Sequence, residues 1–156
     1  MRRTRAVESW TLIPLETFVE ETGARLTLLM TPAGQVLAQY GFTRAVDVMA
    51  AAALGAAIFS STTEIAKMLR EREFAAVNHQ GVRHGIFLGS FSTRRGRLLA
   101  LVVYGPDSSV GLVQLFFEDL VAKLMAASPE KVEQRPVLAA DFERELTQSL
   151  ASLFGR

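Results

Sequence analysis

Residues 44–70, RAVDVMAAAALGAAIFSSTTEIAKMLR, are the stretch that decides the fold of this chain. Apolar residues recur in it at alternating steps of 4 and 3 residues, the spacing that lines one face of an α-helix. The pattern predicts one long helix whose apolar stripe faces the protein core. The stripe consists of Leu54, Ile58, Ser61, Ile65 and Met68.

A second face of the same helix carries mostly small, uncharged side chains: Ala52, Ala56, Ser60, Thr63 and Lys67. Such a face permits the backbone of a neighbour to approach closely. One interpretation is that it packs under another helix or under a sheet. The other is a protein interface, because the first stripe already supplies a core face and a solvated face usually carries more charge.

Strands are predicted on both sides of this helix. Two of them form a hairpin, because residues 31–34, TPAG, place proline and glycine at turn positions. The strand LLALVVY is apolar throughout, so we expect it at the centre of a sheet with both faces covered. In chain order, the strands are residues 25–30, 35–40, 74–80, 85–90 and 98–104.

Two more helices are predicted around these strands. Residues 4–22 have helical spacing but include Pro14, so this helix either kinks there or begins near it, and Gly23 is expected to end it. A further helix follows the loop 105–109 and extends to residue 127. The fold class is therefore α+β, with a five-stranded, mostly antiparallel sheet. The order is helix, two strands, long helix, three strands and helix.

The sequence predicts that residues 128–156 are separate from the main domain. We expect a domain over residues 1–127, a linker over 128–138 and an amphipathic C-terminal helix over 139–156. The linker is polar and holds two prolines. The apolar residues of the last helix are Phe142, Leu146, Leu150 and Leu153.

Composition narrows the class of protein. The 156 residues are 49% apolar, carry a formal net charge of +1 and contain no cysteine. A balanced charge argues against a nucleic-acid partner, and the lack of cysteine excludes disulfides, thiolate metal sites and a cysteine nucleophile. The longest uncharged apolar run, residues 48–59, is shorter than the roughly 20 residues that span a bilayer. We therefore expect a cytoplasmic protein without a membrane span.

The sequence holds no recognisable catalytic motif. It lacks the phosphate-binding G-x-x-x-x-G-K-[ST] pattern and the nucleophile motif G-x-S-x-G. The hydroxyl run of residues 60–63 lies in a predicted helix without a paired histidine or aspartate. His79 and His84 are five residues apart, which does not fit metal ligands on one face of a strand or helix. We expect no catalytic residue, no metal and no cofactor, so the chain is not an enzyme.

Arg94, Arg95 and Arg97 cluster at a predicted hairpin tip. Charged residues at such a tip are usually solvated. Two functional interpretations stay open: contact with nucleic-acid phosphates, and an arginine inserted into a GTPase site.

Several stretches together resemble the Roadblock/dynein-light-chain family and, within it, the bacterial proteins that set polarity in gliding motility. The most specific is residues 74–85, FAAVNHQGVRHG, at the third strand and its turn. Residues 21–25, ETGAR, and 66–69, AKML, also fit, as does Gly111. The likeness covers residues 22–124 and the C-terminal helix.

The resemblance implies a homodimer, or a higher oligomer, in which the long helices lie side by side and the third strands pair edge to edge. The paired helices would form a platform for a GTP-bound Ras-like small GTPase. The dimer would activate GTP hydrolysis by remodelling the GTPase's switch regions, without an arginine finger. The platform would consist of Ala52, Ala56, Phe59, Ser60, Thr63 and Lys67, and the dimer interface of Ala53, Ala57, Ala75, Val77 and His79.

Two other functions remain open from the sequence. One is a Roadblock scaffold that keeps the dimer but does not activate a GTPase. The other is a ligand-sensing module of the PAS or GAF kind, which would need a buried, polar-lined pocket. The C-terminal helix could dock on its own domain or reach the GTPase.

Overall fold

Strand β6 (Gly96–Tyr104) is central in the fold, as its apolar sequence predicts. It lies between β2 (Leu26–Met30) and β5 (Gly85–Thr93) and is antiparallel to both. Its side chains alternate between two buried clusters, one on each face of the sheet. Leu98, Ala100 and Val102 belong to the first cluster, and Leu99 and Leu101 to the second.

The computed structural model describes residues 3–72, 74–130 and 135–153. Three further strands, β1 (Thr4–Ala6), β3 (Val36–Tyr40) and β4 (Ala76–Gln80), complete an α+β fold with one sheet. The strand order is β1-β3-β2-β6-β5-β4, and every described pair is antiparallel.

The sheet therefore has six strands, and the prediction of five was wrong. The additional strand is β1, which pairs with β3. It lies in the stretch, residues 4–22, that was expected to form a helix with a kink at Pro14 or a helix beginning near Pro14. After a short 3-10 turn at Ser9–Thr11, that helix begins only at Leu12, with Pro14 in its first turn. Proline fits the first turn because the amide hydrogens there have no partner within the helix. The residues before the helix extend instead along the edge of the sheet.

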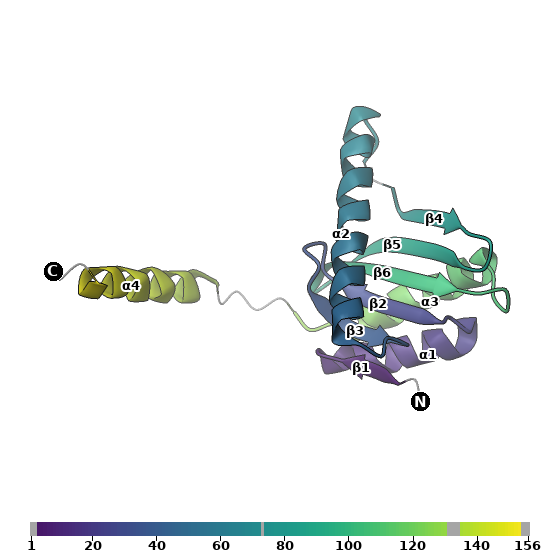
Figure 1. The fold of residues 1–156 in the computed structure, drawn as a ribbon, viewed down its shortest axis with the longest axis horizontal. Coiled ribbons are helices and arrows are strands. Elements are labelled where there is room, and N and C mark those ends of the chain that lie inside the picture. Colours follow the sequence, from purple (N-terminus) through teal and green to yellow (C-terminus); the bar gives the residue numbers. More distant parts are fainter. Residues whose placement is uncertain (1–2, 73, 131–134, 154–156) are drawn as a thin grey trace.

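Helices cover the two faces unequally (Figure 1). Helices α1 (Leu12–Thr22) and α3 (Val110–Ala127) pack side by side on one face. Both ends predicted from the sequence are present: Gly23 ends α1 with a φ of 68°, and the Ser109 hydroxyl caps α3 by accepting from the Leu112 N–H. On the other face, α2 (Ala45–Met68) is the one helix that packs against the sheet among the residues that the structure describes.

The C-terminal helix α4 (Arg135–Leu153) is drawn away from the sheet in Figure 1. It begins at Arg135, inside the stretch expected to be a linker, rather than at residue 139. Residues 131–134 of that linker, and residues 154–156 of the expected helix, lie outside the described residues.

Helix α2 turns a different face to the sheet from the one predicted. Its buried residues are Ala52, Gly55 and Ala66, and a Cβ at Gly55 would overlap the methyl group of Met30. These small residues let the helix lie close to the strands. The predicted core stripe is largely exposed instead: Leu54 is 66% and Met68 82% accessible.

By length and composition alone, α2 qualifies as a helix able to cross a membrane. Such a single helix is weak grounds for a membrane span, because a helix of a soluble fold passes the same test. The expectation of no span rested on residues 48–59 only, and the whole helix is longer. Only 11% of its most apolar window is buried, so one chain leaves much apolar helix surface exposed.

We expect Gly41→Ala to destabilise the fold by about 3 kcal/mol or more, because two costs add. Gly41 has a φ of 88°, and its Cβ would overlap the backbone oxygen of Arg25. Gly23→Ala is the matched control: its φ is 68°, but no atom lies within 4 Å of the added Cβ. That control should lose only about 1 kcal/mol. Urea unfolding of both variants measures the difference, and equal losses would contradict the overlap at Gly41.

Candidate protein-interaction surface

A groove runs between α2 and the strands beside it, on the flank nearer to β4. Its volume is about 680 Å³, and almost all of its lining is apolar. The lining includes Leu54, Ala57, Ile58, Val77, His79 and Ile86. A groove of this size and character on a single chain is typical of a surface that another protein covers.

Strand β4 borders this groove and forms one end of the sheet. It pairs with β5 only, so its other edge has no strand partner among the residues that the structure describes. Its residues are mostly exposed. An unpaired edge of this kind can add a strand from another chain.

The groove and the strand edge bring together most of the predicted dimer residues. Ala57, Val77 and His79 line the groove. Ala53 and Ala75 are exposed but do not line it, and the Ala75 carbonyl accepts a hydrogen bond from the Ser90 N–H.

Three groove residues were not recognised as surface residues from the sequence. Leu54 and Ile58 were placed in the core stripe, and Ile86 was not singled out. The signal that could have found Leu54 and Ile58 was the same alternation of 4 and 3 residues. The pattern identified an apolar face correctly but not what covers that face.

The predicted platform residues lie toward the other flank of α2. We call Ala56, Ser60, Thr63 and Lys67 the outer flank. Ser60 and Lys67 are exposed, and Lys67 pairs with Glu64 at 2.9 Å. Ala56 and Thr63 are half-buried, and the Thr63 hydroxyl donates to the Phe59 carbonyl.

Two predicted platform residues face the protein itself. Ala52 is only 2% accessible and belongs to the buried cluster beneath α2, so its side chain is not available to a partner. Phe59 is half-buried and packs against the same cluster.

The three arginines at the β5–β6 hairpin tip make contacts within the chain. Arg95 forms an ion pair with Glu8 at 3.0 Å, and the Glu8 carboxylate also accepts from the Trp10 indole. The Arg94 guanidinium donates to the Ala126 carbonyl, and Arg97 donates to the Ser90 hydroxyl. These contacts give the cluster a structural role.

The two histidines occupy separate environments. His79 lines the groove, whereas the His84 ring lies 3.1 Å from the Arg25 guanidinium. Among the described residues, no three His, Cys, Asp or Glu side chains gather as a metal site would require.

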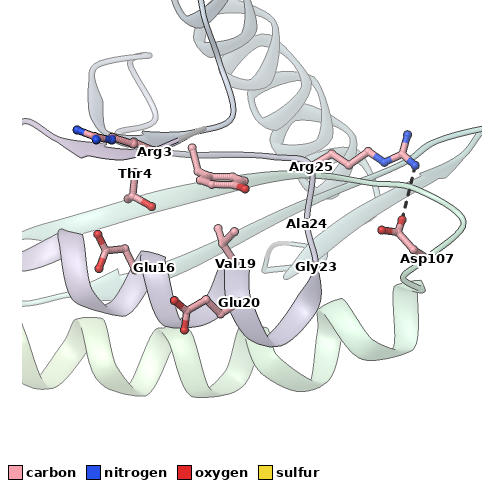
Figure 2. Close-up of a pocket in the computed structure, with 10 residues that line it drawn as sticks. Arg3, Thr4, Glu16, Val19, Glu20, Gly23, Ala24, Arg25 and Asp107 are labelled. Carbon is pink, nitrogen blue, oxygen red and sulfur yellow. Dashed lines mark ion pairs between the residues drawn. The ribbon is translucent and has the colours of Figure 1, made fainter. Parts of the chain in front are cut away.

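A polar cleft of about 720 Å³ lies beside α1, between β1 and the C-terminal end of the helix (Figure 2). Glu16 and Glu20 project from α1 on one side, and Arg3 lies across from them. Arg25 and Asp107 form an ion pair at 3.7 Å at the far end. Several lining residues are exposed, so this is a surface cleft and not the buried polar pocket that a ligand sensor would need.

Solved structures share the fold described above. The gliding protein MglB of Thermus thermophilus is 27% identical over 76% of this chain and 88% of that one, with a TM-score of 0.66. The chain has a Roadblock fold close to that of MglB.

Two further Roadblock-type structures agree at the level of the fold. Myxococcus xanthus MglB is 23% identical over 70% of this chain and 87% of its own, with a TM-score of 0.63. A Roadblock/LC7 domain from Streptomyces avermitilis is 14% identical over 71% and 91%, with a TM-score of 0.62. No family model and no curated protein matches the sequence.

We expect Arg95→Ala to lower the free energy of unfolding by about 1 kcal/mol, because the Arg95–Glu8 pair is well shielded from solvent. The two side chains are 28% and 25% accessible. Arg83→Ala serves as the control, since Arg83 is exposed, and should change stability by less than about 0.5 kcal/mol. If chemical denaturation finds the same stability for both variants, the hairpin arginine is merely solvated.

Proposed function

We propose that this chain is a homodimeric activator of a bacterial Ras-like small GTPase. The observation that carries the proposal is the apolar groove beside α2, bordered by strand β4, whose outer edge has no strand partner among the described residues. The likeness to MglB, a gliding protein, points to a Roadblock-type regulator, and the absence of a catalytic motif in the sequence agrees with a regulatory role.

The proposed dimer places the α2 helix of a second copy against the groove. Leu54 and Ile58 would then lose the exposure that they have in one chain. The β4 strands of the two copies would pair around a two-fold axis and join the two sheets. The continuity of groove and strand edge supports this arrangement, because both belong to one surface.

The same assembly accounts for the hydropathy of α2 without a membrane. An 18-residue window of the helix has a mean hydropathy of 1.5, and a single sheet covers only one side of it. A second copy would cover another side, which stabilises the association because apolar area is removed from water. We therefore propose a cytoplasmic setting.

The GTPase would bind on the exposed surface of the paired helices, including the outer flank. Small side chains such as Ala56 and Ser60 let a partner's backbone approach closely. Activation would come from differential binding: the platform favours the switch conformation that is competent for hydrolysis. The dimer contributes no chemistry of its own, and the intramolecular contacts of Arg94, Arg95 and Arg97 support a mechanism without an arginine finger.

The dimer is tested by Leu54→Glu. A carboxylate in the groove would be buried without a partner, so the dimer dissociation constant should rise at least about 100-fold. Analytical ultracentrifugation measures it. Leu115→Glu on α3 is the matched control, because Leu115 is 60% and Leu54 66% accessible but Leu115 lies on the opposite face of the sheet. A parent chain that is monomeric, or equal effects of the two variants, would contradict the proposed interface.

GTPase activation is tested with Ras-like GTPases encoded in the same genome. We expect the parent chain to accelerate single-turnover GTP hydrolysis by its partner. Ser60→Arg should lower that stimulation at least about tenfold while the dimer persists. Ser60 is preferable to Ala56 because it is exposed, whereas Ala56 is half-buried against the turn at Gly34.

The control for this assay is Arg83→Ala, which lies away from α2 and should stimulate as the parent does. Binding to the GTP-bound partner without faster hydrolysis would instead identify a scaffold. Undiminished stimulation by Ser60→Arg would show that the outer flank is not the platform.

A further inference from the structure

A second hollow lies on the flank of α2 away from the groove, over strands β3 and β1. We call it the trough. Its volume is about 370 Å³, and it is bounded by the first two turns of α2 and by the loop before them. Two of its apolar residues are conspicuously uncovered: Val7 is 79% and Met49 70% accessible. Its other apolar residues include Val36, Phe42 and Val48.

The surface that the trough offers to an occupant is mainly apolar. Gln39 on β3 lines the trough but is only 9% accessible, and its side-chain oxygen lies beneath the surface, out of reach of a docking segment. The trough therefore favours an occupant that brings apolar side chains.

Helix α4 offers such side chains. Leu146, Leu150 and Leu153 follow each other at steps of 4 and 3 and are 49%, 46% and 79% accessible, so they form an exposed apolar stripe. Glu145 flanks this stripe on one side.

Charge also favours this pairing. Arg5 and Arg44 line the trough, and both side chains are exposed. Arg44 already contacts Asp47 at 3.5 Å, whereas Arg5 leaves its charge toward the solvent. The Glu145 carboxylate would find opposite charge at this rim.

A chain of contacts brings the start of the C-terminal segment close to the trough. The buried Ser128 hydroxyl accepts from the Arg94 N–H, and the neighbouring Arg95 pairs with Glu8. Glu8 directly follows Val7, which lines the trough. The segment thus leaves α3 at the end of the sheet where β1 ends.

The connection is long enough for α4 to cross the sheet edge. Residues 129–134 separate Ser128 from Arg135, and six residues extend to about 20 Å. A short tether gives the two surfaces a high effective concentration, so a small contact area suffices for docking.

We propose that α4 docks its Leu146–Leu150–Leu153 stripe in the trough of its own chain. The leucines cover Val7 and Met49, and Glu145 faces Arg5. Because Met49 lies on the same flank of α2 as Ala56 and Ser60, the docked helix borders the outer flank. Its effect on GTPase access rests on the proposed function; the docking itself does not.

The experiment uses the full chain, whose lack of cysteine makes introduced pairs unambiguous. The double variant Met49→Cys, Leu150→Cys is oxidised at low micromolar concentration, and intrachain disulfide is followed by gel mobility and mass. The control pair is Met68→Cys, Leu150→Cys. Met68 is as exposed as Met49 but lies near the other end of α2, about 28 Å away along the helix. We expect the first pair to close at least about tenfold faster.

A charge exchange in the same pair tests the location of the contact. Arg5→Glu should slow closure about threefold, and adding Glu145→Arg should restore it. Equal rates for the two cysteine pairs, or an Arg5→Glu rate equal to the parent's, would overturn the proposal. Interchain disulfide would also overturn it, because a second copy would then supply the helix. None of these readouts requires a dimer or a GTPase, so failure here is distinct from failure of the proposed function.

Discussion

The close packing of α2 against the sheet is the constraint on which the rest of this structure depends. Ala52, Gly55 and Ala66 are the residues of α2 that are buried, and at Gly55 even a methyl group would collide with Met30. Small residues in this position bring the helix axis near the strands. They also reduce the area of the sheet that the helix covers. One helix of this kind cannot cover a face of six strands, whereas α1 and α3 together cover the opposite face. The groove and the trough lie where α2 leaves the sheet uncovered, one on each flank.

The groove and the trough, on the two flanks of α2, differ in chemistry. We therefore expect them to bind different segments. The groove is apolar and continuous with the edge of β4 that has no strand partner among the described residues, so a symmetric partner that supplies both a helix and a strand fits it. The trough is smaller and carries arginines at its rim. A tethered amphipathic helix with an acidic residue beside its apolar stripe complements that rim better than a second copy of α2 would. The surface proposed for the GTPase includes the outer flank, which lies on the same side of α2 as the trough.

Much of the fold was predictable because its local signals agree with the tertiary structure. The apolar run of β6, the left-handed Gly23 and the cap at Ser109 each depend on nearby residues, and each was found. Strand β1 was missed because its three residues carry no alternation of their own and are extended only by pairing with β3. In the candidate interaction surface, the groove is lined by Ala57, Val77 and His79, three residues that the resemblance predicts in a dimer interface. Ala52 does not belong to an exposed platform, because spacing alone cannot tell a small residue that packs on a sheet from one that faces a partner.

The prediction that the apolar stripe of α2 faces the core of its own chain failed for a physical reason. A helical period records which residues are kept from water, but it does not record what keeps them from water. Leu54, Ile58 and Ile65 obey the spacing of a core face, yet within one chain Leu54 and Ile65 remain about half exposed or more. Selection acts on the assembled state, so a face that is covered by another chain or by a tethered helix has the same pattern as a true core. When a periodic apolar face is bare in the folded chain, the pattern is therefore an argument for the missing partner, and α2 and α4 both present such a face.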